Sequence, residues 1–444
     1  MPAWQNSMRC AVSSVWLRLY RDSAGASRAT KRAAGSSFIK LSAVAALLFL
    51  AFVSVSAQNT WVASANEKNP SHWVGTWASS PQLADQPPPP PLADTTLRQI
   101  VHVSLGGTKI RVRFSNAFGK TALTIASAHV AKAAGGGTIQ SGTDQPLTFD
   151  KQSSVAIPPG ALMYSDPVDF DLPPLSDLAI TIHLKDPPDG VTTHAGSRAT
   201  SYFTAGDFVS AVELPSPQTV DHWYFLNGVD VARRARSATV VILGDSITDG
   251  KNSTTNGNGR WPDELARRLP LNKHTRNVGV LNEGIGGNRL LHDGLGPNAL
   301  ARLDRDVLTQ TGVRWLVVFE GVNDIGTCTK ACDPDSTANE IIAAYQQIVL
   351  RAHSQNIHVY GATITPFGNS FYATSDAERA RQKVNAWIRA SGGFDAIIDF
   401  DAVTRDPNNP SNLSRGMDSG DHLHPGPAGY KAMGDSVALK LFAK

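Results

Sequence analysis

The sequence predicts two consecutive folded domains, a β-rich domain followed by an α/β domain with a doubly wound parallel sheet. The length of 444 residues is sufficient for two domains that each bury a full core. Residues 73–235 contain many short strand-like runs separated by Pro- and Gly-rich breaks, which is typical of a β-sandwich of jelly-roll-like type. In residues 236–444, short apolar runs alternate with segments of helical period, which is typical of a parallel sheet covered by helices.

Residues 1–57 have the features of an export signal peptide. Lys40 precedes an apolar stretch at 41–55, and the small residues Val55-Ser56-Ala57 suit a cleavage site. The stretch is short for a membrane-spanning helix, which needs about 20 residues, so an uncleaved anchor is the less favoured alternative. Residues 58–72 are polar and are expected to form a loose tail. We therefore expect a secreted or periplasmic protein with no stable membrane anchor.

The net charge of +3 is misleading about the mature chain. Without residues 1–57, 34 basic residues remain against 37 acidic ones, a net charge of −3. This balance indicates no basic surface for nucleic acid or anionic membrane.

Export would remove Cys10 and leave Cys328 and Cys332. In an oxidising compartment this close pair is expected to form a disulfide in an exposed loop, with two free buried thiols as the alternative. Two cysteines alone are too few for a structural zinc site.

Alternation of apolar and polar residues predicts a hairpin near the start of the β-rich domain. One apolar face runs along 97–105, Gly106-Gly107 suggests a turn, and alternation resumes along 110–114. Further strand-like runs in this domain lie at 123–131, 154–157, 178–184 and 201–203.

Five apolar runs predict the strands of the α/β domain. These runs lie at 239–243, 278–281, 315–319, 357–364 and 396–400. Between them, capping boxes at Thr337-x-x-Glu340 and Ser375-x-x-Glu378 predict helix starts, and a last helix is expected from Pro427. The strand order 2-1-3-4-5 is a common arrangement of such a sheet and is the one we expect.

Polar or glycine-rich clusters come after these strands, where a doubly wound sheet binds its ligands. Their sequences are Gly244-Asp245-Ser246, Asn282-x-Gly284-x-Gly286-Gly287-Asn288-Arg289, Gly321-Val322-Asn323-Asp324 and Asp421-His422-Leu423-His424-Pro425. Because four clusters converge on one sheet edge, a catalytic site is a better explanation than four separate turns or caps.

The residue types in these clusters suit nucleophilic catalysis by a serine. Ser246 needs a base to take its proton, and His424 has a side chain that titrates near neutral pH. Asp421 can reach the other ring nitrogen of His424 and fix its tautomer. The oxyanion of a tetrahedral intermediate would bind the backbone N–H groups of Ser246 and Gly287 and the side-chain amide of Asn323.

The four clusters resemble the four blocks of the SGNH (GDSL) hydrolase superfamily, in the same order. The resemblance implies a flavodoxin-like, three-layer α/β/α fold and ester hydrolysis through an acyl-serine, without a metal or another cofactor. It implies Ser246 as nucleophile, Gly287 and Asn323 as oxyanion donors, and Asp421 and His424 as the rest of the triad. We see no departure from the family pattern at these positions.

Three further motifs are similar to a bacterial subgroup that carries an N-terminal β-domain and includes xylanase-associated acetyl esterases. They are the segment 73–82, Phe114-Ser115-Asn116 and Arg260-Trp261-Pro262. This similarity implies short acyl esters as substrates, particularly acetyl groups on a polysaccharide such as xylan. Which residues bind the substrate is not readable from the sequence.

Other interpretations stay open at this point. His422 is a rival base, although it stands only one residue from Asp421. Asp245, Asp249 and Asp324 could serve a magnesium phosphohydrolase, which would leave Ser246 unexplained. The same acyl-serine could serve a lipolytic or aryl esterase or an acyltransferase. A non-catalytic carbohydrate-binding protein is a further alternative.

Overall fold

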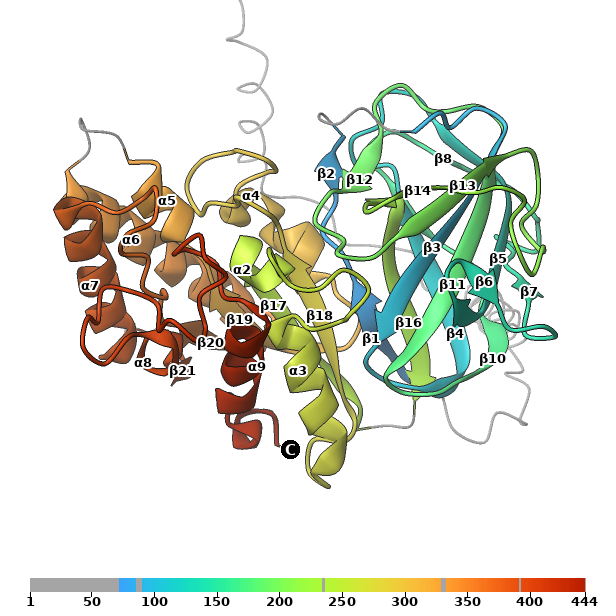
Figure 1. The fold of residues 1–444 in the computed structure, drawn as a ribbon. Helices are drawn as coiled ribbons and strands as arrows, with labels where there is room; N and C mark the ends of the chain where they lie inside the picture. Colours follow the sequence, from blue (N-terminus) through green and yellow to red (C-terminus); the bar gives the residue numbers. More distant parts are fainter. Residues whose placement is uncertain (1–71, 85–89, 234–235, 329–332, 391–392, 444) are drawn as a thin grey trace, which may run out of the picture. The chain divides into compact units, whose positions relative to one another are not determined.

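The computed structural model describes residues 72–84, 90–233, 236–328, 333–390 and 393–443 (Figure 1). The predicted signal peptide, most of the predicted polar tail and Cys332 lie outside these ranges. Residues 69–444 belong to one compact unit. Within the described residues, no helix is both long and apolar enough to cross a membrane.

The first part of the described chain is built from antiparallel sheets. One sheet contains β1 (His72–Ala78), β16 (Leu226–Arg233), β4 (Gly107–Ser115), β10 (Val168–Leu172) and β9 (Leu162–Tyr164). A second contains β14 (Gln218–Val220), β13 (Ser201–Ala205), β3 (Thr95–Val103), β11 (Ser176–Leu184), β5 (Leu123–Gly135), β6 (Thr138–Ile139), β7 (Gln145–Pro146) and β8 (Val155–Ile157). A short third sheet pairs β12 (Thr192–His194) with β15 (Trp223–Tyr224) and β2 (Gln82–Leu83).

The two larger sheets share one hydrophobic core. Val112 and Val229 from the first sheet and Leu97 and Ile180 from the second are completely buried in the same cluster. The alternation of apolar and polar residues along these strands directs one side of each sheet into this core. A β-rich region is therefore present before the α/β part, and its bounds as a separate domain and its jelly-roll-like topology stay predictions.

The predicted hairpin around Gly106 is wrong. β3 pairs with β11 and β13, whereas β4 pairs with β16, β10 and β9, so the two strands lie in different sheets. The connection is closely packed, because a Cβ on Gly106 would lie 2.3 Å from the backbone oxygen of Leu172. The alternation correctly identified two strands, but both bury apolar residues in the same core from opposite sheets, which the pattern alone does not distinguish from a hairpin.

The second part contains the predicted parallel sheet, and its order of β18-β17-β19-β20-β21 confirms the order 2-1-3-4-5. The strands are β17 (Ala238–Gly244), β18 (Val278–Gly284), β19 (Val313–Phe319), β20 (His358–Ala362) and β21 (Ala396–Ile398). All five lie within or overlap the predicted apolar runs. β17 is buried along its whole length, as expected of a central strand covered on both faces.

Helices cover this sheet in two groups. One group comprises α3 (Trp261–Arg268), α8 (Phe400–Thr404) and α9 (Pro427–Ser436), and α3 and α9 lie in front of the sheet in Figure 1. The other comprises α4 (Ala299–Leu303), α5 (Val322–Gly326), α6 (Pro334–His353) and α7 (Ser375–Arg389). Shorter helical turns are η1 (Leu269–Leu271), η2 (Asp304–Leu308) and η3 (Leu439–Phe442).

Two predicted helix starts need small corrections. α6 begins at Pro334, three residues before Thr337, because Asp333 caps it by accepting the N–H of Ser336. α7 begins at Ser375, but the capping side chain is that of Thr374, which accepts the N–H of Ala377. Asp and Thr are both strong N-cap residues, so in each case an earlier cap outcompetes the predicted one.

β1 joins the two parts of the chain, because it pairs with β16 and also packs across β18 and β17. The approach to β18 is very close. A Cβ on Gly279 would lie only 2.3 Å from the backbone oxygen of Gly75. Only glycine at position 279 therefore permits this packing without a shift of the backbone.

Candidate active site

Ser246 lies directly after the central strand β17, at the first position of the short helix α2 (Ser246–Asp249). The strand is fixed on both sides by parallel neighbours, so its end is held rigidly. Asp245 is the N-cap of α2, and its carboxylate accepts the N–H of Ile247 at 2.9 Å. Complete burial raises the pKa of Asp245. Asp245 therefore braces the turn that presents Ser246.

Ser246, His424 and Asp421 form a continuous row of hydrogen bonds. The Oγ atom of Ser246 lies 2.8 Å from Nε2 of His424, and Nδ1 of His424 lies 2.8 Å from Oδ2 of Asp421. Asp421 also accepts the backbone N–H groups of Leu423 and His424 and the side-chain N–H of Asn252. This row has the geometry that a serine nucleophile, its base and an orienting carboxylate require.

The environment favours a neutral His424 beside an ionised Asp421. Partial burial alone would raise the pKa of Asp421, but hydrogen bonds from the backbone and ring of His424 and from the backbone of Leu423 hold it far below its ordinary value. Burial lowers the pKa of His424, the Asp421 carboxylate opposes that shift, and the positive charges of Lys251 and Arg198 add to it. A neutral ring can accept the proton of Ser246.

Gly287 and Asn323 lie beside Ser246 in the same pocket. Gly287 has φ +70°, a conformation that favours glycine. The Asn323 side chain donates from Nδ2 to the backbone oxygen of Asn288 at 2.8 Å. Its Oδ1 accepts the hydroxyl of Tyr372 at 3.0 Å, so Tyr372 fixes which end of the amide is the donor. Nδ2 has a second hydrogen, and Asn323 lines the pocket, so this hydrogen is available to a ligand there.

The rival residues lie in other arrangements. Nδ1 of His422 lies 2.6 Å from Asp418 Oδ2, and the ring is half-exposed. Asp324 accepts the backbone N–H groups of Leu290 and Leu291. Asp249 pairs with His194. Within the described ranges, no group of three His, Cys, Asp or Glu residues is arranged to hold a metal ion.

Ser246 opens into a cavity of about 390 Å³. The Ser–His–Asp row and the oxyanion candidates line it from the α/β part. Gln82, Leu83, Thr193, Arg198 and His222 line it from the β-rich part. Three large apolar side chains on its rim are exposed, namely Leu83, Leu295 and Phe371. The pocket is therefore completed by both parts of the chain.

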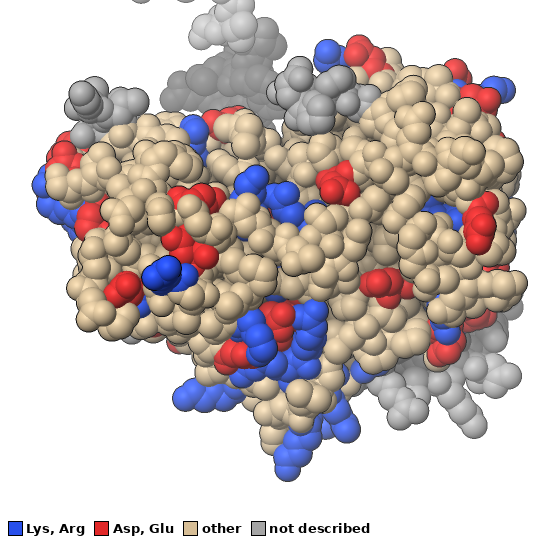
Figure 2. Space-filling model, in the orientation of Figure 1, with Lys and Arg blue, Asp and Glu red and all other residues tan. Residues whose placement is uncertain are grey.

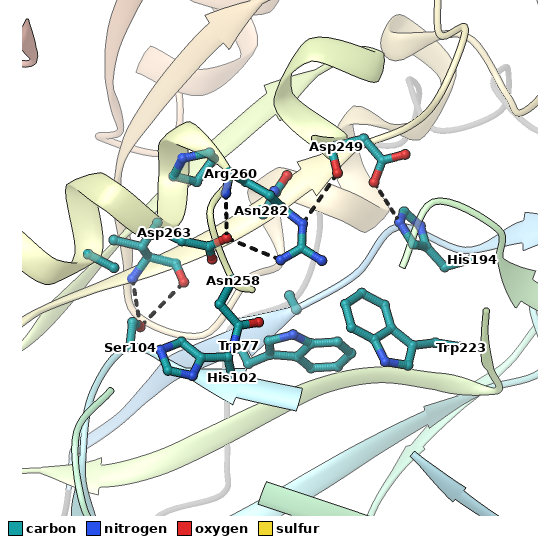
Figure 3. A pocket seen from close by; sticks show the side chains of 14 residues that line it. Trp77, His102, Ser104, His194, Trp223, Asp249, Asn258, Arg260, Asp263 and Asn282 are labelled. Carbon is teal, nitrogen blue, oxygen red and sulfur yellow. Dashed lines mark hydrogen bonds and ion pairs between the residues drawn. The ribbon is translucent and has the colours of Figure 1, made fainter. Parts of the chain in front are cut away.

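Next to this pocket lies a small polar cavity of about 40 Å³ (Figure 3). His194 enters it from β12, and its Nε2 lies 2.9 Å from Oδ1 of Asp249, three residues after Ser246. Nδ1 of the same ring lies 2.9 Å from the backbone oxygen of Ser80. Both ring nitrogens face oxygen acceptors, so both are placed to donate. Arg260 lies beside this pair and donates to the backbone oxygens of Asp249 and Ser197.

Several residues that support the site have no signal in the sequence. Arg302 is completely buried. It donates to Oδ1 of Asn288, the residue that follows Gly287, and to the backbone oxygen of Gly244. It also donates to Ser80 of the β-rich part. Tyr372 and Asn252 come from loops without a recognisable motif. Motifs indicate the reacting groups and not the groups that hold them.

The predicted disulfide is only partly described. Cys328 is disulfide-bonded, and Cys332 lies outside the described residues. The pairing of these two residues therefore stays a prediction.

The central parallel sheet and the Ser–His–Asp row at its edge are those of an α/β serine hydrolase. Residues 242–432 match the family model of the GDSL-like lipase/acylhydrolase family, so this part of the chain is a GDSL-like lipase/acylhydrolase domain. The protein is a carboxylic ester hydrolase, as the resemblance of the four clusters implied.

The chain is also similar to solved structures. A GDSL-like lipase from Bacteroides thetaiotaomicron has 21% sequence identity, with 44% of this chain and 84% of that chain covered and a TM-score of 0.33. An acetyl xylan esterase has 22% identity, with 45% and 96% covered and a TM-score of 0.34. A carbohydrate acetylesterase from Sinorhizobium meliloti has 16% identity, with 46% and 98% covered and a TM-score of 0.36. No match was found among curated proteins.

Proposed function

We propose that the protein is an exported serine esterase that removes short acyl groups, chiefly acetyl, from a polysaccharide such as xylan. The observation that carries the proposal is the 2.8 Å contact between Ser246 Oγ and His424 Nε2 on the floor of an open pocket. Export rests on the signal-like residues 1–57 of the sequence alone.

In the proposed reaction, His424 takes the proton of Ser246 while its Oγ attacks the ester carbonyl carbon. The negative charge on the carbonyl oxygen is stabilised by N–H groups of Ser246, Gly287 and Asn323. His424 then gives its proton to the leaving alcohol, and an acyl-serine remains. Water, deprotonated by His424, attacks the acyl-serine and releases the carboxylic acid and free Ser246. Asp421 holds the ring and stabilises its protonated form.

A short acyl group is supported by the space beside Gly287. A Cβ on Gly287 would lie 2.9 Å from Leu295 Cδ1, so Leu295 covers the backbone that would bind the oxyanion. This apolar side chain bounds the pocket where the acyl group would lie, and a small acyl group fits beside it without displacing it. A polysaccharide is supported by the open rim, where Phe371 is 75% exposed and offers an aromatic face to a sugar ring.

The test is acetate release from acetylated xylan by the wild type, by Ser246→Ala and by the wild type with a chelator. We expect release by the wild type, a loss of at least ~10³-fold in Ser246→Ala, and no effect of the chelator. Hydrolysis of 4-nitrophenyl acetate is measured in parallel. If the aryl ester is cleaved in a Ser246-dependent way and xylan is not, the polysaccharide part of the proposal is wrong.

A further inference from the structure

Two positively charged side chains line the pocket without an ion-pair partner among the described residues. Arg198 comes from the loop after β12, and Lys251 lies just beyond α2. No hydrogen bond or ion pair joins either side chain to another group among the described residues. Asp249 is the only acidic residue of the described pocket lining, and it is already paired with His194. Figure 2 shows Lys and Arg side chains near the centre of the visible face, with Asp and Glu side chains close by.

The Arg198 side chain is partly buried, so the absence of a hydrogen-bond partner for its guanidinium group is energetically unfavourable. Its Nε is shielded from solvent and has no hydrogen-bond partner among the described groups. A buried guanidinium N–H normally has an acceptor, and carboxylates match its geometry best. The side chain is thus available for an acceptor that a ligand brings.

The loop that carries Arg198 is held firmly in place. The backbone oxygen of Arg198 accepts the N–H of Asn256 at 2.9 Å, and that of the preceding Ser197 accepts a hydrogen bond from Arg260. Arg198 itself has φ +46°, which is uncommon for a residue with a side chain. Residues held in this backbone conformation cluster at active and ligand-binding sites. The backbone that carries this cation is therefore in place before a ligand binds, which lowers the entropy cost of binding.

The two cations line the same pocket as His424, the ring that would give its proton to the leaving alcohol. In the proposed reaction the alcohol oxygen receives its proton from His424, so the alcohol must lie next to this ring. The positive charges of Lys251 and Arg198 both lower the pKa of His424, in keeping with their shared place in the pocket lining. The apolar Leu295 lies instead against Gly287, on the side of the oxyanion and the acyl group.

We propose that Arg198 and Lys251 form a carboxylate-binding subsite for the alcohol part of the substrate, so that the ester is carried by a uronate sugar or its neighbour. This inference rests on the proposed esterase function and narrows its substrate class. A uronate presents a carboxylate on a sugar ring, which fits two cations beside an aromatic and apolar rim. It also gives the β-rich part a role, because this part supplies Arg198.

The test compares two substrates that differ in one group, an O-acetylated methyl glucuronide and the same acetylated methyl glucoside. We expect the wild type to have a kcat/KM about 10-fold higher for the glucuronide, mainly through KM, because a charge-assisted hydrogen bond is worth about this factor. This preference should decline as salt is raised, since the cations are partly exposed.

Variants assign the preference to the two side chains. Arg198→Met and Lys251→Met should each lower the glucuronide-to-glucoside ratio by ~3-fold or more, and Arg198→Lys should restore part of it. Lys273→Met is the matched control, because Lys273 is an exposed cation outside the pocket lining, and it should leave the ratio unchanged. Binding of both substrates to Ser246→Ala gives the same comparison without turnover.

The outcomes separate the two proposals. Equal rates on the two sugars, or a preference that survives in both Met variants, would overturn the carboxylate subsite and leave the esterase proposal intact. A stronger preference for the acetylated glucoside 6-phosphate would replace the uronate by a phosphorylated sugar and so overturn the inference. Hydrolysis of 4-nitrophenyl acetate without hydrolysis of either sugar ester would overturn both the sugar substrate and the subsite.

Discussion

At the scale of single residues, His424 should determine how activity depends on pH. The ring accepts the proton of Ser246 only when it is neutral, and burial lowers its pKa below the ordinary value near 6.5. We therefore expect kcat/KM to be constant above about pH 6.5 and to decrease as the pH falls through the lowered pKa. Hydrolysis of 4-nitrophenyl acetate between pH 4 and 8 measures this.

Removing a charge beside the His424 ring should shift, in a predictable direction, the pH at which kcat/KM decreases (the acid limb of the pH profile). Asp421 raises the pKa of His424, so Asp421→Asn should shift the limb to lower pH while lowering the rate by ~10²–10⁴-fold. Lys251 lowers the pKa of the ring, so Lys251→Met should shift the limb to higher pH. A shift of both variants in the same direction would contradict the assignment of His424 as the base.

Tyr372 is predicted to act through Asn323 rather than on the substrate. Its hydroxyl donates to Oδ1 of Asn323 and so fixes Nδ2 as the end of the amide that can donate to the proposed oxyanion. Tyr372→Phe should lower kcat by ~5-fold with a smaller change in KM, since one neutral hydrogen bond is lost. Tyr360→Phe is the control, because its hydroxyl donates to the backbone oxygen of Leu441 and neither residue lines the pocket. An increase in KM alone would instead indicate a contact with the ground-state substrate.

At the scale of the elements, the strands and strand order of the α/β part were predictable from the sequence. For the β-rich part, the sequence predicted that strands are present but not how they pair. The five parallel strands are short apolar runs that end in Gly or polar residues, so the run itself indicates the strand and its carboxyl end. Ser246, Asn323 and His424 could therefore be found in the polar segments beyond these runs. The pairing partners of β3 and β4 could not be predicted in this way. Alternation of apolar and polar residues indicates which face of a strand is buried and not which strand lies beside it.

The contact between β1 and β18 leads to a prediction about stability. Gly279→Ala places a methyl group 2.3 Å from a backbone oxygen of β1, which cannot move without disturbing its sheet. We expect a loss of about 2 kcal/mol in the free energy of unfolding, measured by chemical denaturation. Gly416→Ala is the control, since a Cβ at position 416 would have no atom within 4 Å, and it should be neutral or slightly stabilising. Equal stability of the two variants would show that the strands can separate at little cost.

At the scale of the whole molecule, the pocket depends on residues that are far apart in the sequence. Arg198 and His222 belong to the β-rich part, whereas the proposed reacting groups, Ser246 and His424, belong to the α/β part. Sequence motifs are local, so they indicated the reacting groups and carried no information on which side chains of the first part would reach them. The same limit applies to Arg302, whose partners at Ser80, Gly244 and Asn288 are distant in sequence.

The contact between His194 and Asp249 should be important for holding these parts together. The two side chains are only 4% and 3% exposed, and the second carboxylate oxygen of Asp249 has no partner among the described residues. His194→Ala would leave the carboxylate buried and unpaired, at a cost of about 3 kcal/mol in unfolding free energy. It should also raise KM, because the loop of Arg198 begins directly after β12.

A double-mutant cycle measures the interaction energy between His194 and Asp249 apart from their contacts with other residues. Asp249→Ala alone leaves a ring N–H of His194 without its acceptor, and the double variant removes both partners together. If the two side chains form a pair, the double variant should be more stable than the sum of the single losses predicts, by roughly 1–3 kcal/mol. Additive losses would mean that each residue stabilises its own side of the junction. The β-rich part would then be held chiefly by β1 and Arg302, and the pocket should tolerate substitution of His194.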